Sequence, residues 1–489
     1  MTARDAAPGF PFDSTALHDR IARQWDDDIV PQLIDYIRLP AKSPHFDAQW
    51  ERNGHIEAAV RQAQRWVKRQ DVRGLEVEIV RLPGRTPFLF FDVPAKGAGA
   101  SASTVALYGH LDKQPEMSGW RAQLGPWTPV YEDGRLYGRG GADDGYAVFA
   151  ALSAIAALDA QGVSRPRCVG LIETCEESGS YDLPAYLDAL APRMGDVGLV
   201  IALDSGAGNY DQLWATTSLR GLVNGTLTAS ILSEGVHSGD AGGVVPSSLR
   251  IARQLLDRID DSSTGAVKPA FFSCDIPTER IAQAKEAARI LGDTVWKRFP
   301  WVSCGEGQNA IFAHPVAKDP VELILNRTWR AALAVIGADG LPALESAGNV
   351  QRPTTALKLS LRLPPPVDGE AAAAEMKRIL EADPPYSAKV TFEYDSSASG
   401  WNAPAAAPWL AAALDAASQS FFGKPAAYMG EGGTIPFMSM LGAKFPKAQI
   451  LVTGVLGPKS NAHGPNEFID VPYAKKVTAA TAAVIAAAK

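Results

Sequence analysis

The sequence has few cysteines, no block of basic residues and no apolar segment expected to cross a membrane. Its four cysteines, at positions 168, 175, 274 and 304 of 489, show no CxxC spacing. This argues against a thiolate metal site and predicts reduced thiols in a cytoplasmic protein. Cys175 stands among acidic residues, which disfavour a thiolate, so we do not expect it to act as a nucleophile.

The charge pattern excludes further classes. The formal net charge is −7, and no stripe of basic and aromatic residues is present, so we expect no nucleic-acid partner. Met1–Phe12 lacks the basic flank and apolar core of a signal peptide. The most apolar helix candidate, 147–158, is too short to span a bilayer, so we expect no membrane partner.

The length and composition indicate a globular protein of more than one domain. Apolar residues make up 46% of the chain and charged residues 21%, which is enough for large cores. We predict an α/β protein whose catalytic domain has a mainly parallel sheet flanked by helices. Its first part is 1–212 and its second part 397–489, with an α+β domain, 213–396, inserted between them.

Strands and helices alternate in the first part of the chain. Strands are expected at 103–109, 168–172 and 197–203, with helices at 146–158 and 183–190 between them. This alternation is typical of a parallel sheet with helices on both faces. Further elements precede it: helices at 15–38 and 54–70, and strands at 77–81 and 88–93.

The inserted and final parts have a different character. Elements expected in the insertion are β-rich runs over 213–232, 354–363 and 388–394, and helices over 247–259, 278–291 and 369–380. After it we expect a helix at 409–422, a glycine-rich loop at 430–433, a strand at 449–453 and a helix at 473–488.

Polar residues follow each of the three strands of the expected parallel sheet. His110 ends the first strand, Glu176 and Glu177 follow the second, and Asp204 follows the third. In such sheets function gathers at the carboxyl ends of the strands. We therefore expect these side chains to meet.

A glycine-rich turn adds two more carboxylates. Asp143 and Asp144 follow Gly138-Arg139-Gly140-Gly141 at the start of an alanine-rich helix. Adjacent buried carboxylates are costly unless a cation neutralises them, which predicts a metal site with His110 and Asp143 among its ligands. Asp112, two residues after His110, can hold that imidazole in one tautomer.

The donor set indicates which ions fit. Imidazoles at His110 and His463, together with several carboxylates, suit Zn²⁺, Mn²⁺ or Co²⁺. Two such ions about 3.5–4 Å apart can polarise a water together, while one carboxylate stays off the metals as the base. Glu176 and Glu177 could divide that work if they lie on an extended segment, where neighbours point to opposite sides.

These motifs resemble the M20 family of metallopeptidases, and within it the carnosinase-like branch of cytosolic non-specific dipeptidases. They occur in the family's order between about residues 105 and 465. The residues that carry the resemblance are Gly109-His110-Leu111-Asp112-Lys113-Gln114-Pro115, Gly138-Arg139-Gly140-Gly141-Ala142-Asp143-Asp144, Glu176-Glu177-Ser178-Gly179-Ser180, Asp204, Gly235-Val236-His237-Ser238-Gly239, Glu431-Gly432-Gly433-Thr434-Ile435-Pro436 and Ala462-His463.

The resemblance implies a set of metal ligands. His110 and Asp204 would bind one divalent ion, and Glu177 and His463 the other. Asp143 would bridge both ions and precede a cis peptide bond to the next residue. Zn²⁺ is the expected ion, with Mn²⁺ or Co²⁺ as alternatives.

The resemblance also implies roles beyond the metals. Glu176 would be the general base and then the general acid, and Asp112 would orient His110. His237, acting from a partner subunit, would stabilise the oxyanion. Arg362 and Thr434 would hold the substrate carboxylate, and the inserted domain would be a lid that forms a homodimer.

Three of these residues have a simpler explanation. His237 could belong to a plain turn, Arg362 could be a surface charge on an edge strand, and Thr434 could cap a helix. The chain also departs from the family pattern in three places. Gly145-Tyr146 replaces the usual Lys-Gly, Gly430 replaces an arginine, and Lys113 replaces an apolar residue.

We predict a dinuclear hydrolase that cleaves the amide bond of dipeptides or short peptides with a free carboxylate. The alternative within enzymes is an N-acyl-amino-acid deacylase, which uses the same chemistry with a different pocket. A catalytically silent metal-binding protein on the same fold is the competing class. Such a protein would be expected to lack the base Glu176 or a ligand, and this chain has all of them.

Overall fold

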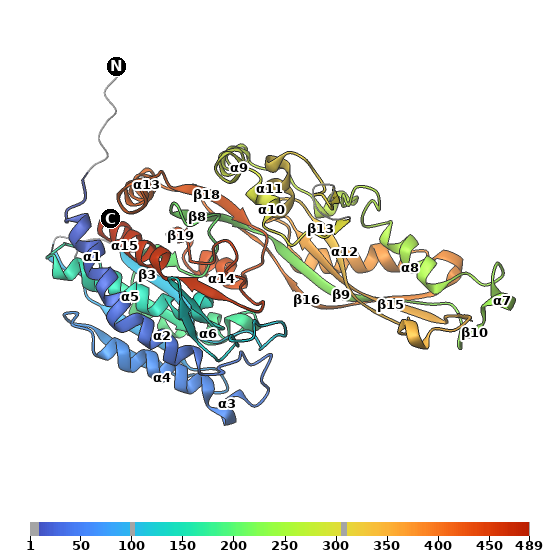
Figure 1. Cartoon of the computed structure of the whole chain (residues 1–489), viewed down its shortest axis with the longest axis horizontal. Coiled ribbons are helices and arrows are strands. Elements are labelled where there is room, and N and C mark those ends of the chain that lie inside the picture. The colour runs from blue at the N-terminus through green and yellow to red at the C-terminus, as the bar shows by residue number, and fades with distance from the viewer. Residues whose placement is uncertain (1–8, 98–102, 305–310, 489) are drawn as a thin grey trace, which may run out of the picture. The chain divides into compact units, whose positions relative to one another are not determined.

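The structure is a computed structural model that describes residues 9–97, 103–304 and 311–488, without the side chains of Cys304 and Ile311 (Figure 1). It forms two compact units. The first comprises Met1–Thr216, Ala403–Met429 and Met440–Lys489, and the second comprises Thr217–Asn402 and Gly430–Ser439. The chain passes between the units within β8 (Trp214–Leu219), after β17 (Trp401–Asn402), at the end of β18 (Ala427–Glu431) and within α14 (Pro436–Lys444).

A six-stranded mixed sheet forms the centre of the first unit. Its strands, in spatial order, are β1 (Glu76–Val80), β2 (Phe88–Val93), β6 (Cys168–Glu173), β3 (Thr104–His110), β7 (Val197–Ala202) and β19 (Gln449–Val452). The last four strands run parallel to one another, whereas β2 pairs antiparallel with β6 and β1 pairs antiparallel with β2 at the edge. Every residue of β3 and β6 is buried, as expected for central parallel strands.

Helices flank this sheet (Figure 1). They are α1 (Ser14–Gln24), the π-helical turn Trp25–Ile29, α2 (Val30–Ile37), α3 (Trp50–Asn53), α4 (His55–Lys68), α5 (Ala147–Ala160), α6 (Leu183–Met194), α13 (Pro408–Phe422) and α15 (Val471–Ala487). Asp13 caps α1 and Asp470 caps α15, each by accepting backbone N–H groups of the first turn. The sequence prediction of an α/β unit with flanking helices is confirmed.

Helix α5 is the central core helix of this unit. It packs on β3 and β6 and against α15, α1 and α4. Together with the preceding turn it forms a helical segment, Gly141–Ala160, that is long and apolar enough to cross a membrane. The sequence prediction, which limited this helix to 147–158, therefore underestimated its length. All of its most apolar window is buried inside the protein, as in the core helix of a folded domain.

A small three-stranded antiparallel sheet lies beside the turn that precedes α5. Its strands are β20 (Phe468–Asp470), β5 (Arg135–Tyr137) and β4 (Val130–Glu132). The sequence analysis did not predict these strands, because three residues are too few for a period-2 pattern. Strand β20 follows His463 in the sequence, and β5 precedes Asp143, so this sheet holds the segments of these two residues together.

The second unit contains a four-stranded antiparallel sheet. Its strands, in spatial order, are β13 (Ala332–Asp339), β15 (Thr354–Leu363), β9 (Gly221–Ser230) and β16 (Lys389–Ala398). Burial alternates strictly along β9 and β15, so one face is buried and the other is polar. The buried face carries Val223, Leu227 and Leu359, which form one core with Ile251 and Met376.

Helices α8 (Ser248–Leu256) and α12 (Gly369–Glu381) cover that buried face. The unit's other elements are β10 (Val236–His237), α7 (Ser238–Ala241), α9 (Thr278–Leu291), α10 (Thr294–Lys297), β11 (Ser303–Cys304), β12 (Ile311–Phe312), α11 (Pro320–Thr328) and β14 (Val350–Gln351). The α+β prediction for the inserted part is confirmed, although α11 and β13 were not predicted. The lid and dimerisation roles stay predictions.

Candidate metal centre

Three parallel strands of the first unit bring polar side chains to one edge of the sheet. Strand β3 lies between β6 and β7, and His110 at its end pairs in register with Glu173 at the end of β6. Asp204 follows β7 by two residues, and Glu176 follows β6 by three. The carboxyl ends of the strands therefore meet, as the sequence pattern predicts.

Two groups of donor atoms share Asp143. The first group is His110, Asp143 and Asp204, and the second is Asp143, Glu177 and His463. Within each group one donor atom from every residue lies within 4.8 Å of the others. The five residues that the sequence analysis proposed as ligands are thus the members of these two groups.

The two carboxylate oxygens of Asp143 face different histidines. Oδ1 lies 3.3 Å from Nε2 of His110, and Oδ2 lies 3.0 Å from Nε2 of His463. Nε2 of His110 is also 3.7 Å from Oδ2 of Asp204, and Nε2 of His463 is 3.4 Å from Oε2 of Glu177. One carboxylate therefore stands at the centre of the cluster, with one histidine and one acid on each side.

The peptide bond between Asp143 and Asp144 is cis, as the resemblance implies. Asp144 points differently from Asp143: its Oδ2 accepts the backbone N–H of His110 at 3.3 Å. The two neighbouring carboxylates therefore do not share one role, and Asp144 supports the strand end that carries His110.

Asp112 holds both the histidine and the acidic turn. The Nδ1 atom of His110 lies 3.1 Å from the backbone oxygen of Asp112 and 3.5 Å from its Oδ1. The same carboxylate accepts the backbone N–H groups of Glu176 at 3.1 Å and Glu177 at 3.0 Å. One buried acid thus positions side chains at the ends of two strands.

Glu176 and Glu177 lie in a 3₁₀ turn, Glu176–Ser178, rather than on an extended segment. The expectation that they would point to opposite sides of a strand was therefore wrong in its premise. Their roles still differ. Oε2 of Glu176 lies 4.0 Å from Nε2 of His110. Glu177 belongs to the second donor group, and its Oε2 accepts a hydrogen bond of 2.5 Å from the side-chain amide of Gln114.

Burial dominates the electrostatics of these acids. Burial, and then the charge of Asp143, raises the pKa of Glu177 to about 8. Burial raises the pKa of Asp204 to about 7, with Asp143 acting in the same direction. Burial and the charge of Asp204 raise the pKa of Glu176 well above its usual value. The cluster therefore holds more negative charge than its surroundings neutralise.

The pKa of His463 is raised as well, but by its acidic neighbours and not by burial. Burial opposes it, but the hydrogen bond with Asp143 and the charge of Glu177 raise the pKa of His463 to about 9. The buried Oε1 of Glu177 has no hydrogen-bond partner among the described residues. An orphaned carboxylate oxygen beside imidazoles and carboxylates is the donor set that divalent cations bind, so these residues fit a pair of such ions.

An ion pair that the sequence analysis did not assign holds the loop of His463. Arg139 and Glu467 are 1% and 0% exposed, and Nη1 of Arg139 donates to Glu467 at 2.5 Å. Nη2 of the same arginine donates to the backbone oxygens of His463 at 3.0 Å and Gly464 at 2.9 Å. Glu467 in turn accepts the N–H of Gly140 at 2.8 Å. The pair therefore joins the His463 loop to the turn before Asp143.

Two departures from the family pattern acquire a structural reason. Lys113 is fully buried, and its Nζ donates to the backbone oxygens of Tyr36 at 2.8 Å and Leu39 at 2.9 Å, at the end of α2. Tyr146 donates to the backbone oxygen of Leu203, next to Asp204. Both side chains thus tie segments of the centre to the surrounding core.

The ring of Tyr36 lies so close to the backbone of residue 145 that only glycine fits there. A Cβ atom there would lie 2.1 Å from Cε1 of Tyr36. The hydroxyl of Tyr36 donates to the backbone oxygen of Leu111 at 3.1 Å, between His110 and Asp112. The tyrosine that supports the histidine turn therefore leaves no room for a side chain at this position.

Three predicted residues lie in the second unit. His237 is exposed, and its Nδ1 accepts the N–H of Gly239 at 3.2 Å at the start of α7. Arg362 lies on β15, an inner strand, and donates to Oγ1 of Thr434 at 2.9 Å. The alternative that made Arg362 an edge-strand charge was wrong. Thr434 is also not the residue before α14, which begins at Pro436.

Neither buried cysteine of the described residues belongs to the two donor groups. Cys168 and Cys175 are buried and free. Burial, with the nearby charges of Glu173 and Asp112, raises the pKa of Cys175 above its usual value, which agrees with the prediction that it is not a nucleophile. The side chain of Cys304 lies outside the described residues.

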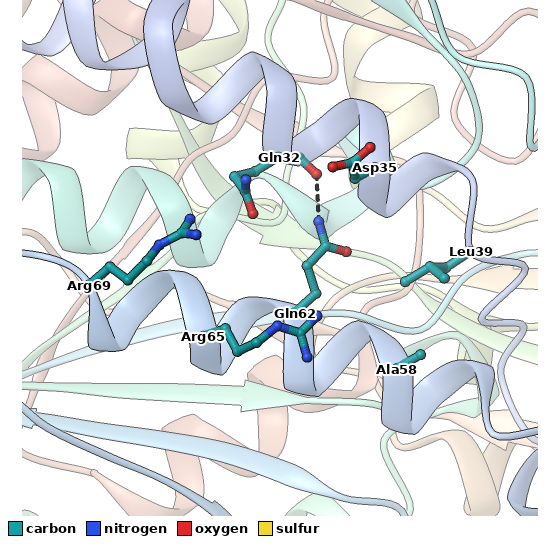
Figure 2. A pocket seen from close by; sticks show the side chains of 7 residues that line it. All are labelled: Gln32, Asp35, Leu39, Ala58, Gln62, Arg65 and Arg69. Atoms are coloured by element: carbon teal, nitrogen blue, oxygen red, sulfur yellow. Dashed lines mark hydrogen bonds between the residues drawn. The ribbon is translucent and has the colours of Figure 1, made fainter.

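A cavity of about 290 Å³ lies elsewhere in the first unit, between α2 and α4 (Figure 2). Gln32, Gln62, Arg65 and Arg69 are among the residues that line it, and Gln62 donates to the backbone oxygen of Gln32 at 2.8 Å. No candidate ligand is among its lining residues, so this cavity is separate from the metal centre.

A largely parallel sheet that carries a buried imidazole, a second, half-exposed imidazole and several carboxylates at its carboxyl edge is typical of a metal-dependent hydrolase. Comparison with known families agrees: the model of peptidase family M20/M25/M40 matches residues 106–487. The chain belongs to this family and is a metallopeptidase. The resemblance to its dipeptidase branch is confirmed by the relatives that follow.

The chain is 27% identical over 492 residues to a cysteinylglycine-S-conjugate dipeptidase of Corynebacterium striatum, covering 99% of this chain and 98% of that protein. Among solved structures it resembles the dipeptidase Dug1p of Saccharomyces cerevisiae, with a TM-score of 0.74, 20% identity and coverage of 97% and 98%. It resembles human carnosine dipeptidase 1 equally, with a TM-score of 0.74, 20% identity and coverage of 98% and 99%. These two likenesses show a shared fold.

Proposed function

We propose that this protein hydrolyses the amide bond of dipeptides or short peptides that carry a free C-terminal carboxylate, using two divalent ions. The observation that carries the proposal is the position of Asp143 between two donor groups, each with one histidine and one further acid. The names of the relatives, which are dipeptidases, support the substrate class.

The proposed ligands are His110 and Asp204 for one ion and Glu177 and His463 for the other, with Asp143 shared. Zn²⁺ is the proposed ion, because two imidazoles with carboxylates suit it, and Mn²⁺ or Co²⁺ are alternatives. Bound ions would supply Lewis acidity, polarising the amide carbonyl and lowering the pKa of a water.

Glu176 is the proposed general base and acid. Its carboxylate lies beside the cluster without belonging to either donor group. Its raised pKa suits a group that must both accept and release a proton near neutral pH. It takes a proton from the attacking water and gives it to the nitrogen of the departing amine, so one residue serves both steps.

The remaining roles are proposed for the second unit. Arg362 and Thr434, already hydrogen-bonded to each other, bind the carboxylate of the substrate. His237 stabilises the oxyanion from the partner subunit of a homodimer. The exposed apolar side chains of Val335 and Ile336 on the edge strand β13 support a subunit interface there. A cytoplasmic location, like the homodimer, is part of the proposal.

A substrate panel tests the proposal. The protein is loaded with Zn²⁺, its metal content is measured, and it is assayed with dipeptides and with N-acetyl amino acids. Cleavage of dipeptides is the expected result, with two ions per chain. Cleavage of only the N-acetyl compounds would instead support the deacylase alternative, and no hydrolysis by the loaded protein would support the catalytically silent class.

A further inference from the structure

The side chain of Glu177 is held at the metal centre by one residue. Nε2 of Gln114 donates to its Oε2 at 2.5 Å, and its Oε1 is buried without a hydrogen-bond partner. In the part of the chain that the structure describes, the carboxylate of Glu177 accepts no other hydrogen bond. Without this bond the glutamate could adopt other side-chain conformations, and ion binding would then include the entropic cost of ordering it.

The donor is a neutral amide, which suits a place beside a cation site. A lysine or arginine here would form a charged pair with Glu177 and compete with a bound ion for its negative charge. The amide N–H of Gln114 orients the carboxylate and leaves that charge available to an ion. Gln114 therefore has the chemistry expected of a group that positions a metal ligand.

The backbone around Gln114 is fixed on both sides. The backbone oxygen of Lys113 accepts the N–H of Ser43 at 2.9 Å, and that of Pro115 accepts a hydrogen bond of 3.2 Å from Nε of Arg139. The side chain of Lys113 is buried and anchored at the end of α2. The amide of Gln114 therefore extends from a segment that has little freedom to move.

Arg139 connects this segment to the histidine of the second donor group. Besides Pro115, its guanidinium donates to the backbone oxygen of His463 at 3.0 Å. Nε2 of His463 lies 3.4 Å from Oε2 of Glu177, the oxygen that Gln114 holds. One framework of hydrogen bonds thus places the acid and the imidazole of this group beside each other.

The first donor group does not depend on this framework. Asp112 positions the imidazole of His110, as described above. Within the described ranges no hydrogen bond joins Gln114 to His110 or to Asp204. A change at Gln114 should therefore affect the two groups unequally.

Building on the proposed function, we propose that Gln114 is a positioning residue for the second donor group. It holds Glu177 beside His463 and so sets the affinity for the ion that these two residues would bind, without acting on the other ion. Gln114 acts through the carboxylate of Glu177 and is itself no ligand.

Gln114→Met tests this role, because methionine has nearly the same length and no N–H to donate. Metal-free wild type and variant are titrated with Zn²⁺ by calorimetry, and the bound metal is measured. The affinity for one ion should fall by about 10- to 100-fold, while that for the other stays within about twofold of the wild type. Thermal unfolding checks that the variant is folded. Gln114→Ala is a second variant with the same expected result.

Gln24→Met is the matched control. Gln24 is another half-buried glutamine of the first unit, and its Nε2 donates to Oε1 of Gln70 at 2.9 Å. Neither of these residues belongs to a donor group. This variant should bind both ions with the wild-type affinities.

Combining Gln114→Met with Glu177→Gln separates positioning from a general effect on the fold. The double variant should bind the remaining ion as Glu177→Gln does, because both substitutions then act on the same contact. Unchanged affinities for both ions in folded Gln114→Met, weaker binding of both, or a further loss in the double variant would overturn the inference while leaving the proposed function in place. Fewer than two ions in the wild type would instead overturn the proposed function, and the role of Gln114 with it.

Discussion

The acidic cluster of the first unit and two arginines of the second, Arg220 and Arg362, present the same electrostatic problem with opposite signs. In the first, Asp143, Glu177 and Asp204 are gathered at the ends of parallel strands, where burial raises the pKa of the last two. In the second, Arg220 and Arg362 lie at one end of an antiparallel sheet, where burial lowers the pKa of both. In the proposed function, divalent cations stabilise the acids and the carboxylate of the substrate stabilises Arg362.

The first unit also contains a buried arginine and a buried acid that are direct partners. Arg139 and Glu467 are as buried as any of these acids and arginines, yet each has the other as a partner. Buried charge alone therefore does not mark a binding site.

The largest effect is expected from Glu176→Gln, which separates chemistry from metal binding inside the acidic cluster. Because this side chain belongs to neither donor group, two ions should remain bound while kcat falls by about 100- to 10,000-fold. Metal analysis and steady-state kinetics measure the two effects. Glu177→Gln is the matched variant, and it should lose both activity and bound metal. Full activity in Glu176→Gln would show that Glu176 has no part in the mechanism.

His237→Ala tests whether a residue of the second unit acts on the reaction without touching the ions. Loss of one oxyanion donor should lower kcat by about 100- to 1,000-fold with unchanged metal content. His314→Ala, another exposed histidine of the same unit, is the control and should have no effect. An unchanged rate in His237→Ala would show that His237 is a turn residue without a role in the reaction.

A change of pH should affect the acids and the arginines differently. Glu177 and His463, with pKa values raised to about 8 and 9, carry protons near neutral pH that a metal ion must displace. Metal affinity should therefore rise between pH 6 and pH 8, by about tenfold per pH unit for each proton released. The arginines stay charged over this range, since even Arg220 has a pKa of about 10.

Calorimetry in buffers of different ionisation enthalpy measures both the metal affinity and the number of protons released. Equal metal affinity at pH 6 and pH 8 would contradict the account of the acidic cluster.

Glu467→Gln should have the smallest effect, because this acid is a support and not a ligand. It weakens the ion pair that holds the His463 loop, so the affinity for one of the two ions should fall by about 10- to 100-fold. Glu132→Gln alters an exposed pair with Arg121 and should change nothing. Metal titration measures the affinity for each ion, and thermal unfolding checks that the variant is folded. Loss of both ions would contradict the view that Glu467 supports only the His463 loop.

Much of the first unit could be predicted from the sequence because its signals are local. Apolar runs mark β3, β6 and β7, and the polar residues after them mark the functional edge. Parallel strands joined by helices must bring those ends together, so the grouping of His110 and Asp204 follows from the pattern. The position of His463, more than 250 residues later, came only through the family motif.

The supports of the centre could not be predicted in this way. Arg139 lies inside a quoted motif and Glu467 follows His463 by four residues, but nothing local joins the two. The same holds for Lys113, whose partners are backbone oxygens at the end of α2. Every residue has a backbone oxygen, so the sequence does not indicate which of them a side chain will contact. Such contacts can be identified only in the folded structure.

By itself, the order of residues determined the two kinds of sheet, the strand ends that carry histidine and carboxylate, and the family. Only the folded chain decided that Glu176 and Glu177 share a 3₁₀ turn and that Arg139 and Glu467 together hold the loop of His463. The physical reason is range. Periodicity and turn chemistry act over a few residues, whereas uncompensated charge is a sum over side chains that only tertiary packing brings within a few ångströms.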